Sequence, residues 1–220
     1  MGECLELVTS LHKITERDYL SRMQDDKVEC MQIARRFDLD FWDGNRRYGY
    51  GGFKYDGRWK EVAEKLVKNY NLPPDASILD VGCGKGFLLY ELKQLLPESR
   101  VCGLDISDYA ISDAKTEIRE SLILHRAQDE YPFAENEFDL VISLTTLHNL
   151  QLPELKSALQ EIERVGRSKY LVVEGYRNEA ELFNLQCWAL TCESFFRPEE
   201  WVWLFAEFGY SGDYEFIYFE

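Results

Sequence analysis

The sequence is poor in the residues that build metal sites and disulfide frameworks. Its 220 residues include only three histidines and six cysteines, and no two cysteines form a CxxC pair. The usual zinc-binding spacings are therefore absent, and no disulfide framework is indicated. We expect free thiols and no metal site, which is typical of a reducing, cytoplasmic compartment.

Long apolar runs are also missing. No segment approaches the roughly 18 consecutive apolar residues that a membrane-spanning helix needs. The first residues, MGECLELVTSLHK, are too acidic and too weakly apolar for a signal peptide. We therefore predict a cytoplasmic protein with no membrane partner.

Positive charge is scarce as well. Lys and Arg number 25 against 40 Asp and Glu, which gives a formal net charge of −15. A surface this acidic repels nucleic-acid phosphates unless a local basic patch intervenes. We expect no nucleic-acid partner.

The first 70 residues show mostly helical spacing of apolar residues. Three segments carry this spacing: 7–14, 28–37 and 59–67. Between the last two, residues 43–52 contain an Asp, an Asn and four glycines, which predict a loop. Residues 1–70 are thus interpreted as N-terminal helices with a lid loop.

From residue 77 onward, short apolar runs alternate with amphipathic segments of helical length. This alternation predicts βαβ units around a parallel sheet, within one compact domain whose core is 71–220. The predicted strands are 77–81, 101–105, 122–125, 138–144, 170–174 and 214–219. The predicted helices are 88–96, 109–118, 154–165 and an aromatic-rich stretch up to 208.

The strongest local signal is the loop after the first of these strands. Gly82, Gly84 and Gly86 stand at a strand-to-helix turn, where glycine lets the backbone approach a ligand closely. Asp105 ends the next strand and is placed to accept hydrogen bonds from both hydroxyls of a ribose. These features predict a nucleotide-like ligand.

Two details separate S-adenosylmethionine (SAM) from NAD as that ligand. The dinucleotide fingerprint requires glycine where this chain has Phe87. Asp80 precedes the loop, and its carboxylate would repel a pyrophosphate but not the ammonium or sulfonium of SAM. SAM is therefore favoured, and an NAD-dependent oxidoreductase is the alternative of another enzyme class.

The segment Asp80–Gly86 resembles the glycine motif of class I SAM-dependent methyltransferases of the small-molecule type. Segments 103–107, 127–133 and 137–143 agree with that family in order and spacing. The resemblance implies a Rossmann-like, doubly wound α/β fold. It also implies a seven-stranded, mostly parallel sheet whose last strand is antiparallel, which the run 214–219 would supply.

The same resemblance implies which residues bind SAM and its product, S-adenosylhomocysteine. The three glycines would cradle the methionine part, with Asp80 near its amino group. Asp105 would hold the ribose and Ile106 would cover one face of the adenine. The remaining cofactor candidates are Asp129, which would accept from the adenine amine, Gln128, which shares that role, Leu144 at the methyl end, and Arg58, which could bind the SAM carboxylate.

The acceptor side is indicated by the end of the fourth predicted strand, which faces the methyl group in that family. The Asn-Pro-Pro-Tyr tetrapeptide of many amino and nucleobase methyltransferases is absent there. His148 would suit a hydroxyl acceptor as a general base. The alternative is a histidine whose hydrogen bonds are all structural.

Residues 46–60 hold five basic residues and one acid, together with aromatic rings and glycines. We interpret them as a lid in which Arg46, Arg47 or Lys54 binds an anionic group and Tyr50 stacks on the acceptor. The alternative is an ordinary solvated surface loop. Tyr176 and Arg177, after the fifth strand, are further acceptor candidates.

These observations predict O-methylation of a small anionic metabolite, such as a sugar, phosphoryl or carboxylate compound. By analogy with the resembled enzymes, bacterial surface-glycan or natural-product biosynthesis is the expected setting. The alternatives are N-methylation of a small metabolite and a non-catalytic SAM-binding regulator. The aromatic cluster between 188 and 208 is interpreted as core, with a pocket cover or a homodimer surface as alternatives.

Overall fold

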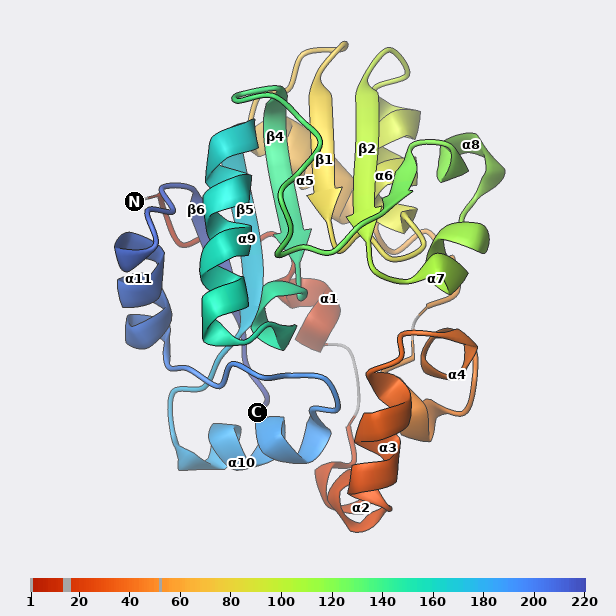
Figure 1. The fold of residues 1–220 in the computed structure, drawn as a ribbon, viewed down its shortest axis with the longest axis vertical. Helices are drawn as coiled ribbons and strands as arrows, with labels where there is room; N and C mark the ends of the chain where they lie inside the picture. The colour runs from red at the N-terminus through yellow and green to blue at the C-terminus, as the bar shows by residue number, and fades with distance from the viewer. Residues whose placement is uncertain (1, 14–16, 52) are drawn as a thin grey trace.

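A computed structural model describes residues 2–13, 17–51 and 53–220. Its centre is a six-stranded sheet with the strand order β3-β2-β1-β4-β5-β6 (Figure 1). Strand order reverses direction between β1 and β4, as in a doubly wound Rossmann-like fold, so the predicted fold class is confirmed. The strands are β1 Ser77–Val81, β2 Arg100–Asp105, β3 Leu122–Leu124, β4 Phe138–Leu144, β5 Gly166–Glu174 and β6 Asp213–Ile217.

The prediction of seven strands with an antiparallel last one is wrong. Among the described residues the sheet has six strands, and β6 runs parallel to β5, with Tyr170 opposite Asp213 and Glu174 opposite Ile217. Two helices lie between β5 and β6, so the chain crosses back over the sheet before it enters β6. A crossover of this kind returns the chain in the same direction, whereas an antiparallel strand can follow a short hairpin.

Helices cover both faces of the sheet. They are α1 Thr9–Lys13, α2 Tyr19–Gln24, α3 Lys27–Ala34, α4 Leu39–Trp42, α5 Lys60–Asn69, α6 Phe87–Leu95, α7 Asp108–Ser112, α8 Thr116–Arg119, α9 Leu152–Val165, α10 Glu179–Trp188 and α11 Pro198–Glu207, with 3₁₀ turns η1 Arg46–Tyr48 and η2 Leu147–Asn149. The predicted helix 109–118 is therefore divided into α7 and α8. The predicted loop 43–52 contains η1. Ile14 and Gly52 belong to predicted segments but lie outside the described residues.

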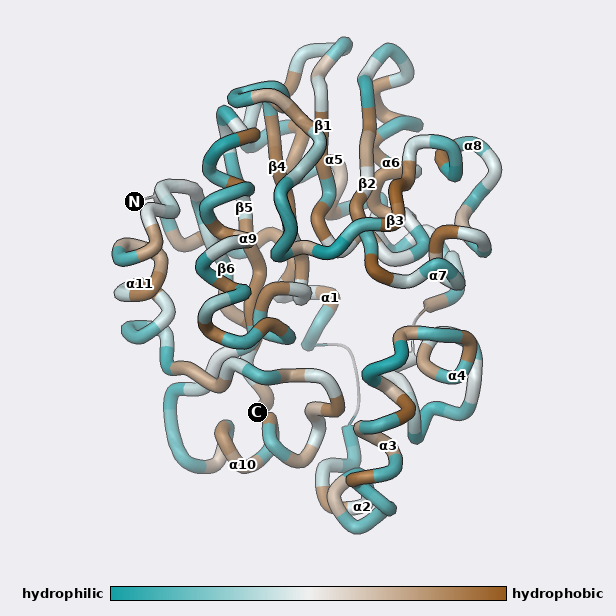
Figure 2. The backbone as a smooth tube through the Cα atoms, viewed as in Figure 1, coloured by the Kyte–Doolittle hydropathy of each residue, from teal (hydrophilic) through white to brown (hydrophobic). Residues whose placement is uncertain are grey.

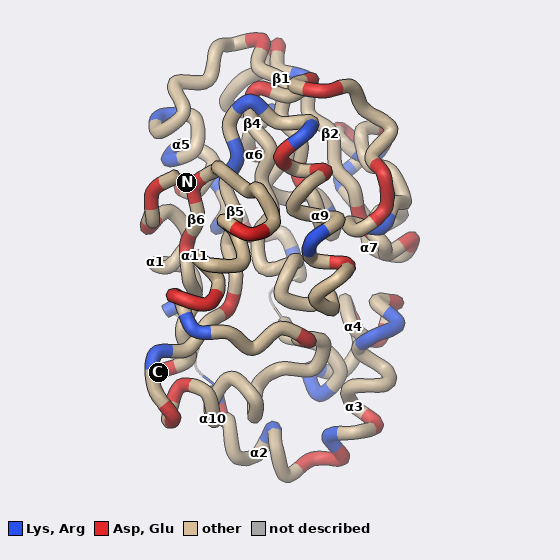
Figure 3. Tube along the Cα trace, turned by 60° about the vertical axis from the view of Figure 1, so that its left-hand side comes forward, with Lys and Arg blue, Asp and Glu red and all other residues tan. Residues whose placement is uncertain are grey.

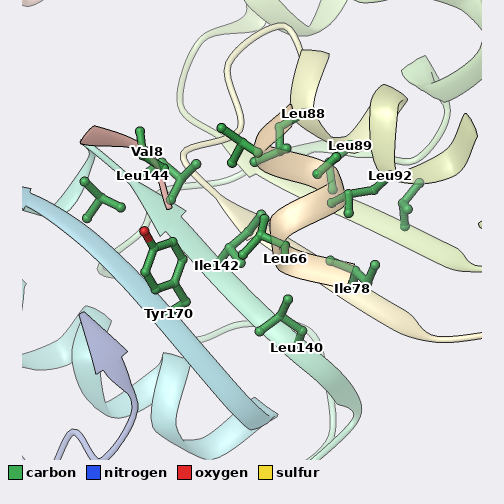
Figure 4. Packing of buried hydrophobic residues seen from close by; sticks show 14 of the residues in the cluster. Val8, Leu66, Ile78, Leu88, Leu89, Leu92, Leu140, Ile142, Leu144 and Tyr170 are labelled. Atoms are coloured by element: carbon green, nitrogen blue, oxygen red, sulfur yellow. The ribbon is translucent and has the colours of Figure 1, made fainter. Parts of the chain in front are cut away.

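Alternation along the strands produces two apolar layers. Ile78 and Ile142 face α5 and α6, where they pack with Leu66 and Leu89 (Figure 4). Their strand neighbours point to the opposite face, since successive side chains in a strand alternate, and pack against α9 and α11. Trp201 and Phe205 of α11 are fully buried in that second layer, which agrees with the core interpretation of this part of the aromatic cluster. Figure 2 shows hydrophobic segments along β1, β2 and β4, while α9 alternates between hydrophilic and hydrophobic turns.

The N-terminal helices α2, α3 and α4 lie beyond the carboxyl ends of the strands, on the same side as α10 (Figure 1). A buried arginine joins these segments. Arg22 donates hydrogen bonds to the carbonyl oxygens of Arg46 at 2.7 Å and Gly49 at 2.9 Å, and its guanidinium lies 4.9 Å from the centre of the Trp188 ring. Within the described ranges, no helix is long and apolar enough to cross a membrane.

Candidate cofactor and acceptor site

A cavity of about 630 Å³ opens at the carboxyl ends of the strands. Its walls come from the ends of β1, β2, β4 and β5 and from the N-terminal segment between Arg35 and Trp59. In doubly wound sheets this edge, beside the point where strand order reverses, is where ligands bind. We call this space the main cavity.

The glycine loop forms one wall of the main cavity, and two of its residues must lack a side chain to pack against their neighbours. Gly82 and Gly84 adopt positive φ angles of 79° and 55°, which favour glycine. A Cβ on Gly82 would come within 2.0 Å of Thr146 Oγ1, and one on Gly84 within 2.7 Å of the Trp42 ring. Gly86 does not line the cavity; its missing Cβ lets α6 begin close to Ile118.

Two buried carboxylates flank this loop. Asp105 Oδ2 accepts a hydrogen bond from the Gly84 amide at 2.7 Å, and Oδ1 accepts one from the Ser107 amide at 2.8 Å. Burial raises the pKa of Asp105, and burial together with the Asp105 charge raises the pKa of Asp80 to about 8. This end of the cavity is therefore suited to a ligand that brings positive charge and hydroxyl donors.

The adenine candidates separate into two groups in space. Ile106 is 48% exposed, and both Ile106 and Gln128 line the main cavity. The Gln128 side chain donates a hydrogen bond to Glu154 Oε1 at 3.0 Å. Asp129 is exposed and is not among the residues of the cavity wall. The geometry thus favours Gln128 over Asp129 in this role.

The carboxyl end of β4 turns sharply into η2. Thr145 makes this turn with a φ of +54°, an unfavourable conformation for a β-branched residue. The turn brings His148 to the cavity wall beside Leu144. His148 is only 4% exposed, and burial lowers its pKa to about 3, so its ring is neutral at physiological pH.

Glu174, at the end of β5, is the neighbour of His148 and was not among the predicted site residues. Its Oε2 lies 3.4 Å from His148 Nε2, and its backbone N–H donates to His148 Nδ1, also at 3.4 Å. Burial raises the pKa of Glu174 to about 8, partly opposed by Arg17. An acidic residue at the carboxyl end of a buried strand is the signal that identifies it.

Aromatic rings form the wall opposite the sheet. Phe53 lies 4.5 Å from Trp42 and 5.2 Å from Phe41 between ring centres. Tyr50 adds a polar tip to this wall, since its hydroxyl accepts a hydrogen bond from the Leu190 amide at 2.7 Å. An acceptor bound here would contact mostly ring faces and edges.

Five of the predicted acceptor residues do not line the main cavity: Arg46, Arg47, Lys54, Tyr176 and Arg177. The Arg47 guanidinium binds the Asp25 carboxylate at 2.6 Å, and Arg46 is exposed with its guanidinium over Trp188. Lys54 lines a neighbouring cavity of about 530 Å³ beside Lys115. Tyr176 lies outside both cavities, against the Arg197 guanidinium.

The cations that do line the main cavity include Arg58, as predicted. Its Nε donates to Asp56 Oδ2 at 2.8 Å. Arg35 also lines the cavity and binds Glu193 at 2.7 Å. Acidic and basic residues alternate along the segment that carries α3 and α4 (Figure 3). Each of these two arginines therefore already has a carboxylate partner.

A polar clamp fixes α4 to the glycine loop. The buried Lys85 ammonium lies 2.6 Å from Asp43 and 2.8 Å from Asp113. Trp42 Nε1 donates to Ser107 Oγ at 2.8 Å. The position of Trp42 over Gly84 thus depends on contacts to both the loop and the start of α7.

Comparison with known proteins adds a family to this geometry. Residues 72–209 match the family described as "Methyltransferase domain". An uncharacterized methyltransferase, sll0829, of Synechocystis sp. is 31% identical over 99 residues, 45% of this chain and 46% of that protein. The arginine-hydroxylase NDUFAF5 of Mus musculus is 30% identical over 138 residues, 61% of this chain and 39% of that protein. The matches thus span less than half the length of these curated relatives.

A solved structure shares the fold over most of the chain. Geranyl diphosphate C-methyltransferase from Streptomyces coelicolor, solved with Mg²⁺, geranyl diphosphate and S-adenosyl-L-homocysteine, superposes with a TM-score of 0.56. The match covers 84% of this chain and 79% of that one at 16% identity. At this identity the likeness supports the fold alone.

Proposed function

The chain belongs to the methyltransferase domain family, and on this premise we propose that it binds SAM in the main cavity and methylates a small molecule. The observation that carries the proposal is the continuity of the cavity. It runs from the glycine loop and its two buried carboxylates to the aromatic wall and the His148–Glu174 pair. A cofactor half and an acceptor half are thereby joined in one space.

The residues of the cofactor half fit SAM. Gly82 and Gly84 line the cavity with backbone alone, which a ligand can approach closely, and Asp80 would lie beside the amino group. Asp105, Ile106 and Gln128 would hold the ribose and adenine. Bound SAM supplies an activated methyl group, so the chain's own task is chiefly to align the acceptor and exclude water.

For the acceptor we propose a small hydroxylated compound, methylated on oxygen. The aromatic wall suits its body, and the pair at the ends of β4 and β5 suits an acceptor that must lose a proton. An anionic group on the acceptor would pair with Arg35 or Arg58 by displacing Glu193 or Asp56. An amine would meet the same carboxylate at Glu174, so N-methylation is the second candidate.

Residues 1–70 are proposed to cover this site, with 71–220 as the core. Phe37, Phe41, Trp42, Tyr50 and Phe53 all come from the first segment and line the main cavity. A homodimer stays a prediction, and Trp203 of α11, 60% exposed, and Phe183 of α10, 49% exposed, are aromatic residues that such a surface would use.

Calorimetric titration of SAM, S-adenosylhomocysteine and NAD tests the cofactor claim, with Asp105→Ala as the control. We expect micromolar SAM binding that the control loses, and no NAD binding. NAD binding without SAM binding would overturn the proposal.

Three phenols with the same nucleophile and different charge test the acceptor claim: p-cresol, tyramine and 4-hydroxybenzoate. Formation of S-adenosylhomocysteine reports turnover, and mass spectrometry of the acceptor distinguishes an added methyl group from an added oxygen, the outcome that the name of the hydroxylase relative suggests. Preference for 4-hydroxybenzoate would support the anionic acceptor, and methylation of the tyramine nitrogen would support the second candidate.

A further inference from the structure

The contacts between His148 and Glu174 determine which nitrogen of the histidine ring carries the proton. The backbone N–H of Glu174 points at His148 Nδ1. A nitrogen that accepts a hydrogen bond carries no proton, and a neutral imidazole has one proton to place. The proton of His148 therefore lies on Nε2, the nitrogen 3.4 Å from the Glu174 carboxylate.

In this arrangement His148 has no nitrogen left to take a proton from an acceptor. Nδ1 accepts from the backbone of β5, and Nε2 already carries the ring proton and lies 3.4 Å from Glu174 Oε2. The carboxylate is in the opposite situation, since Oε1 receives no hydrogen bond from any residue that the structure describes. Glu174 also lines the main cavity with its side chain 16% exposed.

We infer that Glu174 is the group that accepts the acceptor's proton, and that His148 is a positioning residue which orients the Glu174 carboxylate. The inference rests on the proposed function and deepens it. As the acceptor oxygen bonds to the methyl carbon, the bond from that carbon to sulfur breaks and its electron pair stays on sulfur. The hydroxyl proton passes to a Glu174 oxygen and from there to water.

The surroundings of Glu174 are consistent with a proton-accepting carboxylate. Its charged and titratable neighbours are Arg17 before α2, Tyr50 of the aromatic wall, His148 of η2 and Cys192 after α10. Burial keeps its pKa near 8, within the range in which a general base is effective at neutral pH.

The tautomer of His148 tests the arrangement without an acceptor. Nitrogen NMR of histidine-labelled protein bound to S-adenosylhomocysteine is expected to show the Nε2–H form of His148. This form should not change between about pH 5 and about pH 9, because the pKa of His148 is about 3. An Nδ1–H form would overturn the inference, because Nε2 would then be free to act as the base.

Turnover of the best phenol tests the chemical role. The wild-type rate should rise with pH as Glu174 loses its proton. We expect Glu174→Gln to lower kcat by about 10²- to 10⁴-fold with SAM affinity nearly unchanged, and to remove this rise. His148→Asn should lower kcat less and move the rise of rate to higher pH, since it removes the Nε2–H group that lies 3.4 Å from the carboxylate. Glu179→Gln, an exposed carboxylate on α10, is the matched control.

The outcomes separate the two claims. Wild-type protein that fails to bind SAM contradicts the proposed function, whatever the tautomer. Wild-type turnover that Glu174→Gln leaves intact contradicts the role of Glu174 alone, as does a pH profile that only His148→Asn abolishes.

Discussion

At the scale of single residues, we expect Asp80 to couple cofactor binding to proton release. Burial, with the Asp105 charge, raises its pKa to about 8, so the carboxyl is mostly protonated at pH 7 in the free protein. A ligand ammonium nearby favours the charged form and lowers this pKa. We predict that SAM binding at pH 7 releases a proton and that Asp80→Asn releases less. Calorimetry in buffers of different ionisation enthalpy measures the difference, and equal release by both proteins would contradict the prediction.

The same residue gives the free protein a defined pH dependence. Because the folded pKa lies above that of the unfolded chain, the folded state binds more protons between about pH 4 and pH 8. The contribution of Asp80 to stability therefore falls as pH rises through this window, by at most about 1.4 kcal/mol per pH unit. Denaturant unfolding at several pH values should show a shallower decline for Asp80→Asn. A slope identical to wild type would contradict the assignment.

The positions of residues at a strand end or a turn could be predicted from the sequence. Asp80, Asp105, Gly82 and Gly84 line the main cavity, whereas Gly86 does not, and their roles toward the cofactor stay predictions. Arg46 and Arg47 failed to reach the main cavity because the direction of a loop side chain depends on partners far away in sequence, here Asp25 and the Trp188 ring. No local pattern encodes such partners.

At the scale of elements, the clamp holds the four-residue helix α4 against the glycine loop, where Trp42 lines the main cavity. Four residues cannot hold a helix in place without tertiary contacts. We predict that Lys85→Met, which removes the ion pairs to Asp43 and Asp113, weakens SAM binding about tenfold, or ~1.4 kcal/mol. Without these ion pairs α4 is held less firmly, so Trp42 loses its fixed position over Gly84.

Lys115→Met is the control for this prediction, since Lys115 lies outside the clamp and stacks on Tyr55 and Tyr90. Tryptophan fluorescence during SAM titration, with Trp42→Phe as the reference, reports whether Trp42 keeps its position over Gly84. Equal SAM affinities of Lys85→Met and wild type would show that α4 is held by other contacts.

The elements themselves were largely predictable from periodicity, and the error in β6 shows the limit. Residues 214–219 are typical of a strand, but the alternation of apolar and polar residues is the same in a parallel and an antiparallel strand. The antiparallel direction is what the family resemblance implies. The structure instead has β6 directly beside β5, and the N-terminal segment reaches the outer edge of β6 through a bridge from Cys4 to Tyr214.

At the scale of the whole molecule, one buried side chain joins the beginning of the described chain to its end. Glu215 of β6 is 1% exposed and accepts hydrogen bonds from the amides of Leu7, Val8 and Thr9, at 2.5 Å, 3.1 Å and 2.5 Å. The Tyr170 hydroxyl of β5 donates to the same carboxylate. Glu215 thereby joins residues 7–9 and β5 to the last strand.

Removing this carboxylate should therefore destabilise the entire fold rather than one loop. We predict that Glu215→Ala lowers the free energy of unfolding by about 3 kcal/mol or more, since several buried donors lose their acceptor. Glu6→Ala, a nearby exposed carboxylate, should change it by less than about 0.5 kcal/mol. Guanidinium unfolding followed by both tryptophan fluorescence and circular dichroism makes the comparison. If Glu215→Ala unfolds at the wild-type midpoint, the N-terminal segment is held by its apolar contacts, chiefly Val8 in the core, and the carboxylate adds nothing.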